Sequence, residues 1–283
     1  MSIQIVIVTY KTMLSECVAY NTFCQYVHSL TVPYSLLIYN NSPENKITCD
    51  KEYVEVVDAV SNDMLAGAYN FALQAAVKKQ AQWLLLLDQD TQLSQAYFEK
   101  LNDFLTSSFV NQYDVVVPLM RMRTKHLSPI AFSKKTGPFI NQFNSVVNHQ
   151  NFKKCTAKKQ YAAFNSASLL SVKQMTSIGG FDTNYPLDML DHRYYHLLNK
   201  VGAKLYVLDV VLSHSLSLLE KKNTMSKQRY KDYLDKCLMF AKTLGWGAVL
   251  CQKIRLSFSV LMNMLVPHKH QYFKASVKNL FRF

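Results

Sequence analysis

Residues Trp83–Asp90 read WLLLLDQD and join an unbroken apolar run to two acids separated by one residue. Four consecutive leucines predict a strand buried on both faces, because a half-exposed strand alternates apolar and polar residues. Ligands of open parallel sheets bind beyond the carboxyl ends of the strands. The acids that follow the run, Asp88 and Asp90, are therefore the first candidates for a functional site.

Strand and helix patterns alternate on both sides of this stretch. In the N-terminal part we expect strands at Ile3–Val8, Tyr34–Tyr39, Val54–Val57 and Trp83–Leu87, and helices at Ser15–Val27 and Ala66–Lys79. Further along we expect helices at Gln95–Leu105, Ser171–Ser177 and Leu190–Lys200, strands at Tyr113–Pro118 and Ala203–Val211, and loops or a hairpin over Arg121–Gln160. This order predicts an α/β domain with a mostly parallel sheet flanked by helices.

Composition excludes a disordered chain and a disulfide scaffold. The 283 residues are 49% apolar and 12% aromatic, which is enough to fill a core. The six cysteines show no CxxC pair, so reduced thiols in a cytoplasmic protein are the simpler interpretation. The N-terminus has no signal-peptide pattern, and no uninterrupted apolar run approaches the roughly 18–20 residues that cross a bilayer. We therefore expect a soluble or peripheral protein.

Positive charge is concentrated in the C-terminal part. The net charge is +13, and Leu216–Phe283 contains thirteen Lys and Arg against three acids. Two apolar stripes at helical spacing accompany these cations, one at Ile254, Phe258, Leu261 and Leu265 and the other at Phe273, Val277 and Leu280. This pattern predicts helices that either bind an anionic membrane surface or pack on the rest of the chain or a partner subunit. No nucleic-acid-binding motif organises the cations, so we expect no nucleic-acid partner.

The paired acids have two interpretations. Two carboxylates on a tight turn can hold a hard divalent cation that also contacts a diphosphate. Alternatively, Asp88 and Asp90 end the strand and cap the following helix. The histidines His192 and His196 share the i, i+4 spacing of a zinc pair, but without an HExxH pattern we expect them to pack on aromatic residues or face solvent.

An ordered set of motifs resembles family-2 glycosyltransferases of the GT-A fold, over about residues 3–215. The motifs similar to the nucleotide-sugar half are Ile5–Tyr10, Asn40–Ser42, Asn62–Asn70 and Leu84–Thr91, and those similar to the acceptor half are Gly179–Asp182, Asp188–Asp191 and Leu212–Ser215. The Asp-Gln-Asp-Thr form of the acidic motif is similar to the bacterial rhamnosyltransferase branch. The resemblance implies a GT-A domain at residues 1–215, with a nucleotide-sugar half to about residue 118 and an acceptor half after it, followed by a basic helical region at 216–283.

The resemblance also implies roles for individual residues. Asp191 matches the catalytic base, and Asp90 with His214 matches the Mn²⁺ or Mg²⁺ site. Donor contacts are implied for Thr9, Tyr10, Asn40, Asn62, Asp63, Gly67 and Asp88. From the residues alone, Asp191 could instead be a helix N-cap, Asp188 is a rival base, and His214 could be structural.

Two positions depart from the family pattern on the donor side. Tyr39 stands where the family has an Asp that contacts the nucleobase, and Met64 stands where it has a glycine. Recognition of the base is therefore expected to differ, with Asp63 as a substitute acid.

The expected function is inverting, metal-dependent glycosyl transfer in bacterial surface polysaccharide synthesis, including lipopolysaccharide. The resemblance implies a nucleotide-sugar donor such as dTDP-rhamnose, a glycan or lipid-linked glycan acceptor, and a place in the cytoplasm or on the inner face of the inner membrane. The alternatives are a glycosyltransferase-like binding scaffold without turnover, for which Tyr39 and Met64 argue, and a basic membrane- or nucleic-acid-binding module.

Overall fold

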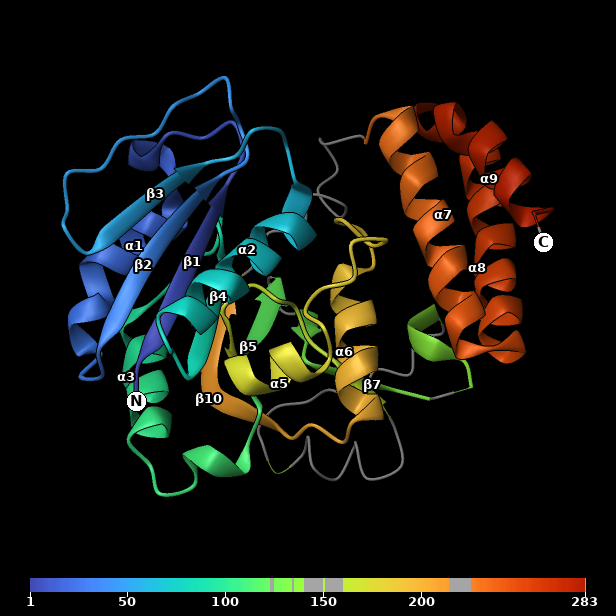
Figure 1. The fold of residues 1–283 in the computed structure, drawn as a ribbon. Coiled ribbons are helices and arrows are strands. Elements are labelled where there is room, and N and C mark those ends of the chain that lie inside the picture. Colours follow the sequence, from blue (N-terminus) through green and yellow to red (C-terminus); the bar gives the residue numbers. More distant parts are fainter. Residues whose placement is uncertain (123–124, 134, 140–149, 151–159, 214–224, 283) are drawn as a thin grey trace.

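The computed structural model describes residues 1–122, 125–133, 135–139, 150, 160–213 and 225–282, and a mixed sheet forms its centre (Figure 1). The strands of this sheet are β1 (Ile3–Thr9), β2 (Tyr34–Asn40), β3 (Val54–Asp58), β4 (Trp83–Asp88), β5 (Val115–Met122), β6 (Lys125–Ser128), β9 (Ser168–Ser171) and β10 (Leu205–Ser213). Their order is β10-β5-β9-β4-β1-β2-β3, with β6 paired to β5. β9 runs antiparallel between β4 and β5, β6 runs antiparallel to β5, and the other pairs are parallel. The predicted mostly parallel α/β sheet is confirmed.

The helices lie over both faces of this sheet and, at the C-terminal end, beside it (Figure 1). They are α1 (Val18–Tyr26), α2 (Met64–Lys78), α3 (Gln95–Leu105), α5 (Val172–Ser177), α6 (Leu190–Lys200), α7 (Lys227–Leu244), α8 (Trp246–Leu265) and α9 (Phe273–Leu280). One apolar cluster joins the sheet to α2, α5 and α6, and a second joins it to α1 and α3. A separate pair of short strands consists of β7 (Ile130–Phe132), within the stretch expected to form loops or a hairpin, and β8 (Gln160–Ala162), which begins at its last residue.

The leucine run of β4 connects the two apolar clusters. Leu84 and Leu86 belong to the cluster under α2, whereas Leu85 and Leu87 belong to the cluster under α1 and α3. All four side chains are fully buried, and each contributes about 2 kcal/mol through removal of apolar surface from water. The run therefore fixes β4 at the centre of the sheet and leaves its carboxyl end as the first point where polar groups reach the surface.

Strand register aligns several polar residues at that edge. Val8 of β1 pairs with Asp88, Thr9 pairs with Asn40 of β2, and Asn40 pairs with Asp58 of β3. Parallel strands in this register end together, so the sheet itself places residues far apart in sequence beside one another.

Among the predicted strands, β5 differs most from its predicted bounds. β5 begins at Val115 and continues past Pro118 to Met122, although a proline usually ends a strand because it lacks an N–H group. The ladder between β5 and β10 shifts register between Val207 and Val211, around the partner of Pro118. The proline is tolerated at this irregularity, where a regular ladder bond is not required.

The C-terminal helices pack beside α6, away from α1 and α3 (Figure 1). The ring of Phe240 on α7 lies 6.1 Å from His192 and 6.0 Å from His196, which confirms that this histidine pair packs on an aromatic residue. The guanidinium of Arg229 donates two hydrogen bonds of 2.9 Å to the carboxylate of Asp188. Apolar residues of α7 and α8 also join the cluster under α2, so the basic helices share a core with the sheet. The expected domain boundary at residue 215 lies outside the described residues.

The two apolar stripes of this region differ in exposure. Phe273, Val277 and Leu280 on α9 are partly buried, since α9 packs against α7 and α8. The stripe on α8 is exposed, with 67% of Phe258 and 64% of Leu265 accessible. By length and composition α8 is also apolar enough to cross a membrane, with 20 residues and a mean hydropathy of 1.2. The sequence expectation considered uninterrupted apolar runs and therefore did not include this helix, in which Lys253 and Arg255 lower the mean hydropathy but leave it at 1.2.

An amide clamp joins α2 to the glycine-containing loop before α6. The side chain of Asn70 donates to the carbonyl of Phe181 at 2.9 Å and accepts from its N–H at 2.8 Å. Gly180 lies in the left-handed region with φ of 73°, and a Cβ there would come within 2.5 Å of Asn70 Oδ1. Gly179 also has a positive φ, of 81°, but its surroundings are open. A side chain at Gly180 would therefore break the clamp as well as strain the backbone.

We expect Gly180→Ala to lower the free energy of unfolding by about 2–4 kcal/mol, as the sum of left-handed strain and the clash with Asn70. The matched control is Gly179→Ala, which adds the strain alone and should cost about 1–2 kcal/mol. Urea titration of the three proteins measures both values. Equal losses in the two variants would contradict the proposed clamp.

Candidate functional site

Asp88 is held at the end of β4 by a buried tyrosine. The hydroxyl of Tyr69 on α2 donates to Asp88 Oδ1 at 2.5 Å, and the backbone N–H of Asp88 donates to Ser166 Oγ at 3.4 Å. The next helix, α3, is capped by Ser94, whose Oγ accepts from the N–H of Tyr97 at 3.2 Å. The alternative in which the acids cap this helix is therefore wrong, and Asp88 is directed toward α2.

The negative charges of three carboxylates act on the Tyr69 hydroxyl, and one of them, Asp88, accepts its hydrogen bond. Burial raises the pKa of Tyr69 well above its usual value, and the negative charges of Asp88, Asp191 and Asp90 raise it further, in that order of effect. The ring of Tyr69 is fully buried and lies 5.1 Å from that of Phe181 in the clamped loop. The charges of Asp88, Asp90 and Asp191, which the sequence singled out, thus all raise the pKa of a tyrosine that it did not.

Asp191 is the second residue of α6 and is not its cap. The N-cap position is Met189, in the left-handed region with φ of 61° and without a side-chain cap. Burial raises the pKa of Asp191 to about 7, and the negative charge of Asp88 raises it too, whereas the nearby Asn165 lowers it. At neutral pH this carboxylate is therefore near the midpoint of its titration and can accept or release a proton.

Asp188, the rival of Asp191, has a different environment. Its side chain is 10% exposed and forms the two-bonded ion pair with Arg229 described above. Both oxygens of this carboxylate accept from one guanidinium, a geometry that fixes the two side chains relative to each other. Asp188 therefore ties α7 to the segment before α6, whereas Asp191 forms no ion pair with an arginine among the described residues.

Asp182 of the Gly-Gly-Phe-Asp loop is likewise an anchoring residue. Burial by itself raises the pKa of Asp182, but hydrogen bonds from Asn184 and the guanidinium of Arg193 bring it below its usual value. The ion pair between Arg193 Nε and Asp182 Oδ2 spans 2.8 Å, and neither side chain is more than 20% exposed. It fixes the loop to α6 at a position two residues after Asp191.

The residues expected to contact the donor differ in exposure and in their hydrogen-bond partners. Tyr10 is 44% exposed, whereas Thr9 is fully buried and its Oγ1 has no hydrogen-bond partner within the described part of the chain. The amide of Asn40 is buried and donates to the carbonyl of Asn45 at 2.5 Å and to Asp58 Oδ1 at 2.8 Å. Asn40 thus shapes the turn after β2 and presents no free amide to a nucleotide, contrary to the expectation of a direct contact.

Asp63 and its neighbours form a second polar turn. The Tyr39 hydroxyl donates to Asp63 Oδ2 at 2.5 Å, so Tyr39 contacts the acid that was expected to substitute for the family's Asp. Asn62 Oδ1 accepts from the N–H of Met64 at 2.9 Å, which holds Met64 in its left-handed conformation with φ of 55°. A Cβ at Gly67 would lie 2.6 Å from the Cβ of Asp63, so this glycine lets the turn approach α2.

The side chains that could bind a divalent cation at this edge of the sheet are carboxylates. Asp88 is partly exposed and Asp90 is exposed, and both belong to the turn at the end of β4. Among the described residues no group of three His, Cys, Asp or Glu side chains could hold a metal ion. His214 lies outside the described residues. Two hard oxygen ligands on one turn fit Mg²⁺ or Mn²⁺, which commonly take their remaining ligands from phosphate oxygens and water.

Solved structures share this architecture. Residues 1–349 of S. aureus TarS, in complex with UDP-GlcNAc, align with a TM-score of 0.53 and 12% identity over 99% of this chain and 82% of that one. The mannosyltransferase PcManGT from Pyrobaculum calidifontis, in complex with GDP-Man and Mn²⁺, aligns with a TM-score of 0.51 and 13% identity over 99% and 87%.

GalNAc-T7 with UDP, GalNAc and Mn²⁺ aligns with a TM-score of 0.51 and 14% identity over 82% of this chain, which spans 47% of that protein. No protein-family model matches the sequence, and no curated protein is significantly similar to it. The likeness to these structures is one of fold, and the fold is of the GT-A type.

Substitution Asp191→Asn should stabilise the protein at high pH. The folded state holds the Asp191 proton up to about pH 7, whereas the unfolded chain releases it near 3.8, so ionisation of Asp191 lowers stability as pH rises between these values. We expect the Asn variant to gain about 2–4 kcal/mol over the wild type at pH 8 and little at pH 4.

Denaturant titration across this pH range measures the difference. The control is Asp50→Asn, at an exposed loop residue, which should leave the pH profile of stability unchanged. Parallel profiles for the wild type and the Asp191 variant would contradict the environment described for this carboxylate.

Proposed function

We propose that the protein transfers a sugar from a nucleotide diphosphate donor to a glycan acceptor, with inversion at the anomeric carbon. The observation that carries the proposal is the position of Asp191, a carboxylate with a pKa of about 7, beside the Asp88–Asp90 turn. A base and a diphosphate-binding edge within one site are the two parts that such a displacement requires. The GT-A type of fold and the nucleotide-sugar complexes of TarS and PcManGT are consistent with it.

Each residue of the site has its own role in the proposed reaction. Asp191 takes the proton of the acceptor hydroxyl while the oxygen of that hydroxyl forms a bond to the anomeric carbon. The bond from that carbon to the diphosphate breaks on the opposite face, and the diphosphate leaves with the electron pair. Asp88 and Asp90 would hold Mn²⁺ or Mg²⁺, which neutralises charge on a diphosphate when bound. Tyr69 keeps Asp88 in place at 2.5 Å, and Asn165 keeps Asp191 partly ionised.

The donor and pathway are part of the same proposal. The Asp-Gln-Asp-Thr sequence at residues 88–91 supports dTDP-rhamnose as the first donor to test. The acceptor would be a glycan or lipid-linked glycan of a bacterial surface polysaccharide, extended on the cytoplasmic side of the inner membrane. On the donor side we assign Tyr10, Asn62 and Asp63 to the nucleoside, with Thr9, Asn40 and Gly67 shaping the turns that carry them.

A second candidate function is a binding scaffold that holds a sugar nucleotide without turnover. The observation in its favour is the hydrogen bond from Tyr39 to Asp63, which already occupies the acid expected to contact the nucleobase. The two candidates differ in one readout, because a scaffold binds the donor but releases no nucleotide diphosphate.

Incubation with a panel of nucleotide sugars, a glycan acceptor and Mn²⁺ should release nucleotide diphosphate, and Asp90→Ala should reduce the release at least about a hundredfold. Asp50→Ala, at an exposed residue of a distant loop, serves as the control and should retain full activity. Donor binding by the wild type without any release would favour the scaffold. Release that is unchanged in Asp90→Ala would contradict the role of the turn.

Substitutions of Asp191 and Asp188, the two acids near the start of α6, should have different effects on kcat. Asp191→Asn removes the base and should lower kcat about 10²–10⁴-fold with little change in the donor KM. Asp188→Asn breaks the ion pair with Arg229, so it should lower thermal stability and leave most of kcat. In the wild type, kcat/KM should rise toward a plateau as pH passes about 7, because protonated Asp191 cannot accept a proton. A loss of kcat confined to Asp188→Asn would reverse the assignment.

A further inference from the structure

Helix α8 has one face of large apolar side chains in contact with solvent. Trp246 is 82% exposed, Phe258 67% and Leu265 64%. Other members of the same face are Leu250, Ile254, Leu261 and Met262, each 47–52% exposed. Because the helix repeats every 3.6 residues, these positions form one continuous stripe along its length. An exposed apolar surface of this extent usually marks an interaction site.

The opposite face fixes the orientation of α8. Ala248, Leu256 and Asn263 are buried against the rest of the protein. The amide of Asn263 donates to Ser276 Oγ on α9 at 2.9 Å and to the hydroxyl of Tyr230 on α7 at 3.3 Å. Turning the apolar stripe inward would break these bonds and expose Asn263, so the stripe faces outward as a stable feature of the fold.

The positive charge of the C-terminal helices determines which kind of surface can bind this stripe. From Lys236 to Phe283 the sequence has eight Lys and Arg and no Asp or Glu. The charged residues within α8 itself are Lys253 and Arg255, both cationic. Two copies of this face would bring like charges together, which opposes self-association, whereas an anionic surface is attracted to it.

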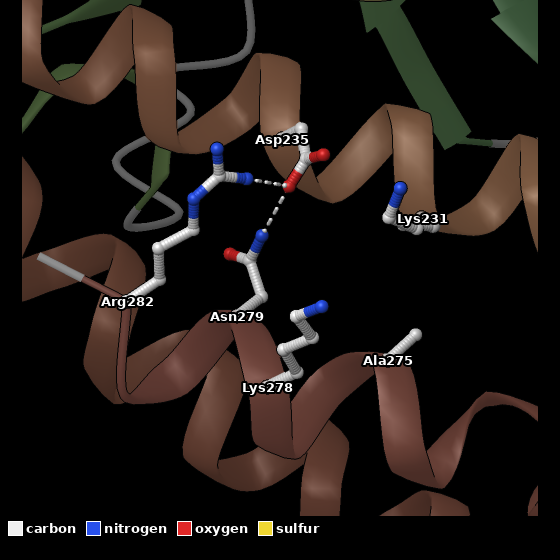
Figure 2. A pocket seen from close by; sticks show the side chains of 6 residues that line it. All are labelled: Lys231, Asp235, Ala275, Lys278, Asn279 and Arg282. Atoms are coloured by element: carbon white, nitrogen blue, oxygen red, sulfur yellow. Dashed lines mark hydrogen bonds and ion pairs between the residues drawn. The ribbon is translucent and has the colours of Figure 1, made fainter.

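A cationic pocket between α7 and α9 adds to the positive electrostatic potential around α8. It has a volume of about 350 Å³ and is lined by Lys231, Asp235, Ala275, Lys278, Asn279 and Arg282. Figure 2 shows that Asp235 is bound by both Arg282 and Asn279, each at 2.8 Å. The acid of the pocket is thus already paired, and Lys231 and Lys278 leave it with net positive charge. A surface that touches α8 is separated from the pocket by about one helix diameter, about 10 Å. This distance is comparable to the Debye length in physiological salt, so the positive charge of the pocket still attracts an anionic surface there.

We infer that α8 docks the protein on an anionic membrane, lying in the plane of the interface with Trp246, Phe258 and Leu265 inserted among the lipid chains. Tryptophan favours the interfacial depth, and cations beside an apolar stripe bind anionic headgroups. A spanning orientation would require α8 to leave α7 and α9 and would place Asn263, Lys253 and Arg255 in hydrocarbon. The inference stands on α8 and its charges and does not depend on the proposed activity.

Sedimentation of the full chain with lipid vesicles tests this docking. Vesicles of phosphatidylcholine and phosphatidylglycerol should bind at least about tenfold more protein than vesicles of phosphatidylcholine alone. Raising salt from about 0.05 M to about 0.5 M should weaken the binding. The double variant Phe258→Asp with Leu265→Asp should reduce the partition coefficient about a hundredfold, since it removes two inserted apolar groups and adds like charge to that of the lipid.

The matched control introduces the same two charges on another surface. Val60→Asp with Val201→Asp replaces residues that are 99% and 54% exposed, and it should leave binding unchanged. Circular dichroism confirms that both double variants are folded. Equal binding by the α8 variant and the wild type, or no preference for anionic vesicles, would overturn the inference. A dimer in light scattering that the α8 variant dissociates, without vesicle binding by the wild type, would assign the stripe to self-association instead.

Discussion

The hydrogen bond from the buried Tyr69 hydroxyl to Asp88 is the contact on which the candidate site depends. At 2.5 Å it joins α2 to the end of β4, and the ring of the same tyrosine packs on Phe181 in the loop before α6. Helix, strand and loop therefore meet at one side chain. Because the hydroxyl is removed from water, its interactions with Asp88 and Asp191 are stronger than they would be at the surface.

The three acids near the start of α6, Asp182, Asp188 and Asp191, differ in their interaction partners. Asp182 and Asp188 are each paired with an arginine, and these ion pairs anchor the loop and α7 around α6. Asp191 faces Asp88 without an arginine partner among the described residues, and the pKa of its buried carboxyl is raised to about 7. Two arginines, Arg193 and Arg229, thus commit Asp182 and Asp188 to ion pairs, whereas Asp191, the base that we propose, has no such partner among the described residues.

The C-terminal helices are both part of the core and the source of an exposed surface. Phe240 packs against the histidines of α6, and the buried face of α8 is fixed by hydrogen bonds to α7 and α9. The outward stripe of α8 is therefore held at a defined angle to the body of the protein. A membrane bound to that stripe would meet the molecule in one orientation, which a flexible basic tail could not provide.

The sequence by itself determined most of the elements and their order, but not β9, the antiparallel strand between β4 and β5. The leucines before Asp88 require burial on two faces, and the periodicity of Gln95–Leu105 and Leu190–Lys200 matches α3 and α6 at both ends. These are local properties, fixed by side-chain spacing and burial. Which polar residues meet was decided by the tertiary structure: Tyr69 reaches Asp88, Arg229 neutralises Asp188 from 41 residues away, and Asn40 is enclosed in its own turn. Such pairings depend on strand register and helix packing, and no local pattern encodes the distance between groups so far apart in the chain.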